Sequence, residues 1–267
     1  NPNYWNAENI KLERVQAKFI NDATADLNAF KNGEIDTTNL STEQAKEFKD
    51  DPRLRYLSDG SVWYIVFNMK NKIVSNKKIR QAITLAIDKE ELIKGVLNGI
   101  GSAVYTYTPK GIGIKGFEKD FAEETGEVFP KYNPEKAKKL LAEGLKELGL
   151  SKAPDMEMIF NDSGNNKAIV EYIQASLRKN LGLNVSLSSM TLKERLARME
   201  RKDFQMSFAG YAGDYRDPIS YLERFETING NNYSQYINPE YDKLLNFVRT
   251  TPDKKARVNT LIKLEKI

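Results

Sequence analysis

The stretch from Phe204 to Pro218, FQMSFAGYAGDYRDP, decides the fold of this chain. In its first half three apolar residues, Phe204, Met206 and Phe208, alternate with polar ones, which is the pattern of a strand with one apolar face. Small residues and glycines follow, and then a single carboxylate, Asp214. The stretch predicts a strand that brings an open backbone and one acid to the rim of a sheet.

The residues after this strand allow two interpretations. Gly210 and Gly213 carry no Cβ that would keep another chain away, so an extended ligand could pair with this edge and place an amino group on Asp214. Alternatively, an ordinary strand leaves its sheet through a glycine turn, and Asp214 caps that turn or the helix that starts near Pro218. The residues of this stretch alone favour the ordinary turn.

Composition narrows the possible functions. The chain has 267 residues, 40% of them hydrophobic and 29% charged, which is typical of a globular protein with a sizeable core. Its net charge of +4 comes from interspersed charges of both signs, so we expect no nucleic-acid partner. The absence of cysteine and histidine excludes Ser-His-Asp triads and zinc sites built on thiolate or imidazole. We expect no cofactor and no metal.

Strand and helix patterns alternate through the C-terminal half. Strands are predicted at 156–160, around 185–187 and in the opening stretch, and each pair of successive strands is separated by a helical segment. This order predicts an α/β fold with a βαβαβ unit, whose ligand groups lie at the strand ends. Asn161 and Asp214 each follow a strand, so we expect them to share one rim.

The N-terminal part shows the same rhythm. We expect strands at 11–20 and 35–37, and helices that begin at Asp22 and at the capping box of Ser41. Two further strands are expected on either side of Asp59-Gly60.

The second of these strands, Val62 to Phe67, is rich in aromatic residues. It is either buried on both faces or presents aromatic side chains to a groove. Core packing suits most of its residues, and Trp63 is the one we include among the candidate ligand contacts.

Residues 111–116 match the pattern G-x-G-x-x-G. Dinucleotide binding by this motif requires an apolar strand directly before it and a helix that opens at its third glycine. Here Pro109 and Lys110 stand where the strand should end. The context favours an irregular loop between 101 and 130 over a phosphate site.

Several segments together resemble the extracytoplasmic oligopeptide-binding proteins of ABC importers, the peptide and nickel class of solute receptors. Each segment is short, and the resemblance lies in their order and spacing along nearly the whole chain. They are Asn1-Pro2-Asn3-Tyr4-Trp5, Ala29-Phe30-Lys31-Asn32-Gly33-Glu34-Ile35-Asp36, Arg80-Gln81-Ala82-Ile83 with Ala86-Ile87-Asp88-Lys89, Tyr132-Asn133-Pro134-Glu135-Lys136-Ala137, and Ala209-Gly210-Tyr211-Ala212-Gly213-Asp214-Tyr215 with Asp217-Pro218.

The resemblance implies a fold and a setting. In that family two α/β lobes close around an extended peptide and deliver it to permease subunits in the membrane. Residues 1–58 would be the end of the first lobe and the crossover, and residues 59–267 the second lobe, incomplete at its C-terminus. We therefore expect an excised segment of a monomeric protein of the periplasm or, lipid-anchored, of the cell surface, with its signal outside this segment.

The resemblance also implies roles for single residues. Asp214 matches the acid that pairs with the α-amino group of the peptide, and Gly210 and Ala212 match the strand that bonds the peptide main chain. Tyr211 matches an aromatic residue beside that strand, and Asn161 falls near another position of the groove.

Two other functions remain open at this point. One is a receptor of the same fold for another solute, such as a signalling peptide, an oligosaccharide or a nickel chelate. The other is a glycosidase that uses Asp214 and Asp217 as its two carboxylates. The position of Asp217 directly before Pro218 favours a helix cap over a catalyst. A free α-amino group needs Asp214 in the cleft, whereas a neutral sugar does not.

Overall fold

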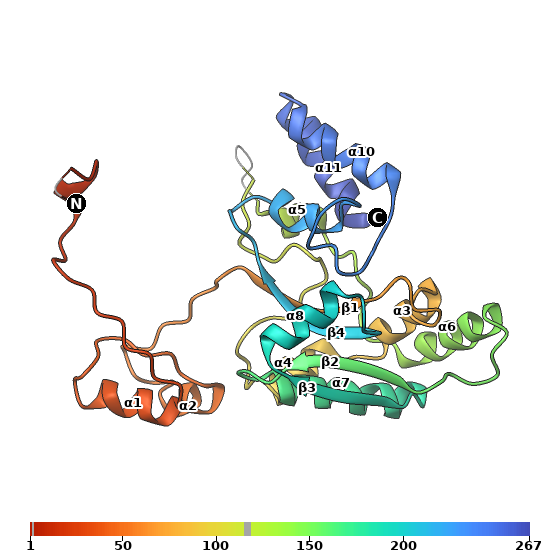
Figure 1. Cartoon of the computed structure of the whole chain (residues 1–267), viewed down its shortest axis with the longest axis horizontal. Helices are drawn as coiled ribbons and strands as arrows, with labels where there is room; N and C mark the ends of the chain where they lie inside the picture. The colour runs from red at the N-terminus through yellow and green to blue at the C-terminus, as the bar shows by residue number, and fades with distance from the viewer. Residues whose placement is uncertain (2, 115–118) are drawn as a thin grey trace. The chain divides into compact units, whose positions relative to one another are not determined.

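The computed structural model describes residues 1, 3–114 and 119–267, which divide into two units, Asn1–Leu54 and Arg55–Ile267 (Figure 1). The first unit contains the 3-10 helix η1 (Ala7–Asn9) and the helices α1 (Ala23–Lys31) and α2 (Thr42–Glu47). All the strands of the described residues lie in the second unit.

In the first unit the predicted helices are confirmed and the predicted strands are wrong. The Asp22 carboxylate accepts from Ala25 N–H at 2.7 Å, and Ser41 forms a capping box with Gln44. Residues 11–20 and 35–37 form no strand, and Phe19 is 96% exposed. Alternating side chains form a strand only beside another strand, and the described residues of this unit supply none.

The second unit is built on a four-stranded sheet in the order β1-β4-β2-β3. β2 is parallel to both β3 and β4, whereas β1 is antiparallel to β4. The predicted βαβαβ unit is therefore confirmed, with β2 at its centre. The strands are β1 (Ser61–Phe67), β2 (Met156–Asn161), β3 (Val185–Met190) and β4 (Met206–Ala212), and the helices between the last three are α7 (Asn166–Leu181) and α8 (Leu192–Glu200).

Local signals delimit these helices. Gly182 ends α7 in the left-handed conformation, and the Thr191 hydroxyl accepts from Glu194 N–H at 3.2 Å at the start of α8.

The prediction of a strand just before Asp59 is wrong, since residues 53–58 form no ladder.

The two faces of the sheet are covered by different helices. On one face Met158, Phe160 and Met206 pack into the main core against α7 and three further helices, α3 (Lys77–Leu85), α4 (Lys89–Gly95) and α6 (Pro134–Glu147). On the other face Ile159 and Ala209 pack against Met199 of α8. The place of α8 beside the sheet can be followed in Figure 1.

A second core joins the C-terminal helices. It is formed by α5 (Phe121–Thr125), α9 (Ile219–Leu222), α10 (Pro239–Thr250) and α11 (Lys254–Lys266), and the 3-10 helix η2 (Glu223–Phe225) continues α9. No helix of the described residues is both long and apolar enough to cross a membrane.

Residues 101–114 form no strand or helix, but the segment 101–130 is not irregular throughout, because the helix α5 lies within it. The last two residues of the glycine motif, Lys115 and Gly116, lie outside the described residues. The Gly111 N–H donates to the Asp120 carboxylate at 2.7 Å. The motif therefore lacks the preceding strand that a dinucleotide site requires.

Two helical glycines give a matched test of packing. A Cβ on Gly144 in α6 would lie 2.7 Å from Ile79 Cγ1 and 3.3 Å from its backbone nitrogen, whereas a Cβ on Gly95 in α4 would meet only the Glu91 carboxylate at 3.4 Å. We predict that Gly144→Ala lowers the free energy of unfolding by about 1–3 kcal/mol, because overpacking outweighs helix propensity. Gly95→Ala should be neutral or stabilising by up to about 1 kcal/mol. Urea denaturation measures both, and equal effects would contradict this account of the α3–α6 contact.

Candidate functional site

β4 has one edge that is only partly paired. It pairs with β1 from Met206 to Ala212, but with β2 only at Met206 and Ser207. The Asn68 N–H donates to the Gln205 carbonyl at 3.0 Å, which sets the alternation of the β1–β4 ladder. In this alternation Gly210 and Ala212 turn their N–H and C=O groups away from β1. Those groups face the edge along which β2 no longer pairs, and we call this the open edge of β4.

A buried arginine stands at the start of the open edge. Arg195 of α8 donates from Nη1 to the Phe208 carbonyl at 3.0 Å and to the Ser207 hydroxyl at 3.3 Å. The residue is only 5% exposed, and burial lowers the pKa of its guanidinium, which nevertheless stays charged. The side chain thus satisfies the first carbonyl that β2 leaves unpaired.

The glycines of this region make room for aromatic rings of the same chain. A Cβ on Gly210 would lie 2.8 Å from the Trp63 indole, and a Cβ on Gly213 would lie 2.7 Å from the Tyr221 ring. Trp63 is 50% exposed and stacks on Phe208 with ring centroids 5.5 Å apart. Position 210 therefore requires glycine, because the Trp63 ring fills the space that a side chain would take. The backbone N–H and C=O of Gly210 still face the open edge.

Asp214 lies beyond the end of β4 and is exposed. Its backbone N–H donates to the Ser220 hydroxyl at 2.9 Å, and its carboxylate accepts from the Tyr211 hydroxyl at 3.3 Å. The same Tyr211 hydroxyl also lies 2.9 Å from the Ser220 carbonyl. Within the described residues no cation pairs with Asp214, so its carboxylate is available to one from outside.

Asn161 is at the same rim but in a different environment. It ends β2, and because β2 and β4 are parallel, their carboxyl ends face the same edge of the sheet. The side chain is 8% exposed and donates to the Ser163 hydroxyl at 2.7 Å. Trp63, Gly210, Tyr211 and Asp214 thus gather around β4, and Asn161 stands on the neighbouring strand without a hydrogen bond to them in the described structure.

The second carboxylate considered from the sequence, Asp217, is already engaged. Its Oδ1 accepts from Ile219 N–H at 3.0 Å, at the start of α9, and from Arg257 Nη2 at 2.9 Å. The N-cap of α9 is Pro218 and has no side-chain cap hydrogen bond, so the expected cap role of Asp217 is wrong, and Asp217 instead binds a backbone amide two residues on and an arginine. A carboxylate held by a backbone amide and a guanidinium is a poor partner for Asp214 in acid–base catalysis.

One residue of this region, Arg224, was not predicted from the sequence. Arg224 of η2 places its guanidinium carbon 4.0 Å from the centroid of the Tyr211 ring. Its only sequence signal is a basic residue within the largely apolar segment that follows Asp217-Pro218. A lone arginine on a short helix is normally predicted to be a solvated surface residue. Only the tertiary fold shows that Arg224 lies over the Tyr211 ring.

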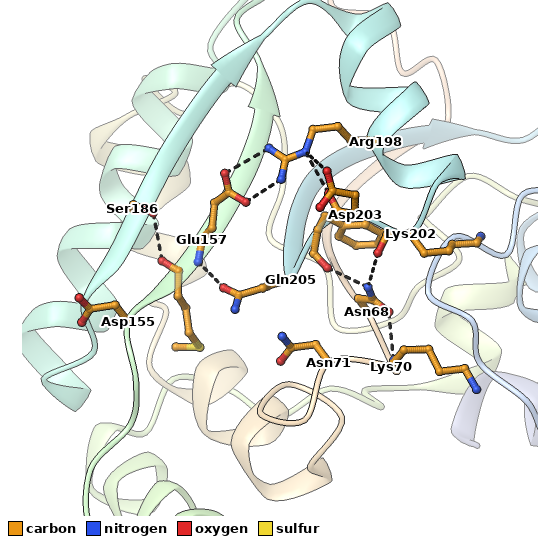
Figure 2. Close-up of a pocket in the computed structure, with 12 residues that line it drawn as sticks. Asn68, Lys70, Asn71, Asp155, Glu157, Ser186, Arg198, Lys202, Asp203 and Gln205 are labelled. Carbon is orange, nitrogen blue, oxygen red and sulfur yellow. Dashed lines mark hydrogen bonds and ion pairs between the residues drawn. The ribbon is translucent and has the colours of Figure 1, made fainter.

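A polar hollow lies at the opposite edge of the sheet, near the amino ends of β2 and β4 (Figure 2). There Arg198 pairs with Glu157 at 2.9 Å and with Asp203 at 3.4 Å, and the Gln205 side chain accepts from Glu157 N–H at 2.6 Å. The hydrogen bond from Arg198 holds the pKa of Glu157 below its ordinary value. These groups satisfy one another, and we interpret the network as structural.

Comparison with known proteins identifies a family and relatives. Residues 1–233 match the family described as bacterial extracellular solute-binding proteins, family 5, middle region. The chain is 34% identical over 277 residues to the oligopeptide-binding protein OppA of Bacillus subtilis, covering 100% of this chain and 50% of that protein. It is 30% identical over 264 residues to the dipeptide-binding protein DppE of the same organism, covering 99% and 48%.

A solved structure is similar over the same extent. Listeria monocytogenes OppA bound to peptide superposes with a TM-score of 0.85 at 33% identity, covering 99% of this chain and 51% of that one. The chain thus spans about half the length of the relatives it matches.

The Glu157–Arg198 pair predicts a pH dependence of stability. Because the folded-state pKa of Glu157 is lowered, its contribution is full above the unfolded-state pKa and is lost as the pH falls through the folded-state value. We predict that Glu157→Gln costs about 1–2 kcal/mol of unfolding free energy at neutral pH, and that the difference from wild type shrinks below about pH 4. Urea denaturation at several pH values measures this, with Glu171→Gln on the exposed face of α7 as the control. A difference that does not change with pH would contradict the assignment.

Proposed function

Because the chain belongs to the bacterial extracellular solute-binding proteins of family 5, we propose that it forms part of a receptor that captures extended oligopeptides for an ABC importer. Residues 1–58 would be the end of the first lobe with the crossover, and residues 59–267 most of the second lobe. The ligand would lie along the open edge of β4, with its amino terminus at Asp214.

The observation that carries the proposal concerns the described part of the chain, where the backbone of Gly210 and Ala212 faces away from β1 without a partner strand, beside an Asp214 carboxylate that no cation pairs. Main-chain hydrogen bonds to an added strand do not depend on side chains, so they suit a receptor for many peptides. A single charge pair at the amino end then sets the direction and register of the ligand. Trp63 and Tyr211 offer ring faces beside this edge, and Asn161 would serve a more distant part of the groove.

The energetic role of Asp214 follows from desolvation. When a second lobe covers the groove, the pair between the ligand's ammonium group and Asp214 leaves water. Removing the acid would then leave a buried charge without a partner, at a cost of about 3–5 kcal/mol. Ligand binding would also shift the equilibrium between open and closed lobes, since only the closed form contacts the peptide on both sides.

The same proposal covers partners and location. The receptor would act outside the cytoplasm as a monomer, in the periplasm or lipid-anchored at the cell surface, and would hand its peptide unchanged to permease subunits. The engaged Asp217 carboxylate argues against a glycosidase. Sugars and nickel chelates lack the strand-like main chain that the open edge suits, which favours peptides over these solutes.

Asp214→Asn in the protein at its full natural length tests the proposal. We predict that calorimetric titration with tri- to pentapeptides gives binding that weakens by at least about a hundredfold in this variant, because the ammonium group loses its counter-charge. N-acetylation of the peptides should weaken binding to wild type to a similar extent. Asp162→Asn, an exposed acid next to Asn161, is the matched control and should bind like wild type. Absence of heat with every peptide would refute the peptide proposal.

A further inference from the structure

Two arginines beside the open edge have no acidic partner. Within the described residues neither Arg195 nor Arg224 forms an ion pair with a carboxylate, whereas Arg198, Arg249 and Arg257 each do. Arg80 of α3 also lacks such a pair, but its guanidinium donates to the Val74 and Ser75 carbonyls. Arg195 is held by the carbonyl and hydroxyl groups of β4, and its buried Nε has no hydrogen-bond partner among the described residues. Neither guanidinium is therefore neutralised by an ion pair within the described residues.

The surroundings of Arg224 are aromatic. Its guanidinium lies over Tyr211, and Tyr107 stands in edge-to-face contact with both Tyr64 and Phe225 at centroid distances of 4.9 and 4.8 Å. Burial lowers the pKa of Arg224, and the tyrosines raise it by more. Ring faces attract the cation but do not neutralise it. A partly desolvated guanidinium without a counter-ion can gain strongly from an incoming carboxylate, which it binds through two parallel hydrogen bonds.

The ladder geometry relates this charge to the open edge. A ligand anchored by its amino group at Asp214 runs back along β4 and is therefore antiparallel to it. In an antiparallel pair, residues directly opposite each other direct their side chains to the same face of the sheet. The ligand residue opposite Tyr211 thus extends its side chain over the face on which Tyr211, Tyr64 and Arg224 gather.

We propose that Arg224 is a specificity-determining residue that makes this receptor prefer peptides with an acidic side chain at the position opposite Tyr211. The inference rests on the proposed function and adds the chemical class of the favoured ligand. Asp214 lies at the hydroxyl end of the Tyr211 ring, and Arg224 lies over the face of the same ring. Together they complement a ligand whose free amino group and acidic side chain are close to each other, which describes the amino-terminal end of an acidic peptide.

The test is a positional scan with the protein at its full natural length. Alanine tetrapeptides that carry glutamate at one of the four positions are compared with their glutamine counterparts by calorimetry. We predict that at one position glutamate binds roughly tenfold more tightly than glutamine, the effect expected for a hydrogen-bonded charge pair. In Arg224→Gln this preference should disappear, while the affinity for the glutamine peptides stays the same and shows that the variant is folded.

The control variant is Arg216→Gln, which removes one exposed positive charge from the loop that carries Asp214. This variant should retain the preference for glutamate, because the proposed preference comes from a specific pair with Arg224 and not from the overall positive charge of the region. Equal binding of glutamate and glutamine peptides to wild type would overturn the inference and leave the peptide receptor intact. A preference that persists in Arg224→Gln would overturn the role of this residue. Failure of every peptide to bind would refute the proposed function itself, and with it the inference.

Discussion

The hydrogen-bond ladder between β1 and β4 is the constraint on which the rest of the structure depends. It holds β4 along its whole length, whereas β2 pairs with only the first two residues of β4. An unpaired strand edge normally invites aggregation and is covered or blunted. In this protein β4 begins as an interior strand between β1 and β2 and continues as an edge strand that pairs with β1 alone. The ladder with β1 therefore holds the part of β4 whose other edge is open.

The side chains around this edge are fixed by packing on both faces. Trp63 occupies the space that a side chain at position 210 would fill, and Tyr221 does the same at position 213. The Tyr221 hydroxyl also donates to the Gly60 carbonyl at 2.8 Å, just before β1, which ties the loop after β4 back to the sheet. Asp214 is therefore presented by a segment that two hydrogen bonds anchor, from the Asp214 N–H to Ser220 and from Tyr221 to Gly60.

Charge is distributed unevenly between the two edges of the sheet. At the amino ends of β2 and β4, Arg198 is neutralised by Glu157 and Asp203, and the pair stabilises the fold. At the carboxyl ends, Asp214 has no cation and Arg224 has no acid among the described residues. In the proposed function a peptide ligand would supply a partner to each of these two charges, and the gain would be larger at the partly desolvated Arg224 than at the exposed Asp214.

Local patterns determined most of the elements of this protein by themselves. The helix starts at Asp22, Ser41 and Asn133 depend on side chains that bond the nearest backbone, and the stop at Gly182 depends on the left-handed conformation that glycine adopts without strain. Short-range sequence is therefore sufficient to predict them.

The βαβαβ order and the position of Asp214 after a strand were also predicted from the sequence. The strand expected at 11–20 was wrong because alternation says nothing about whether a partner strand exists. Only the tertiary structure decided that Trp63 accounts for Gly210, that Asp217 is engaged by Arg257, and that Arg224 lies over Tyr211. Each of these depends on contacts between segments brought together by the sheet and its loops, and a residue's own neighbours in the chain do not encode such distances.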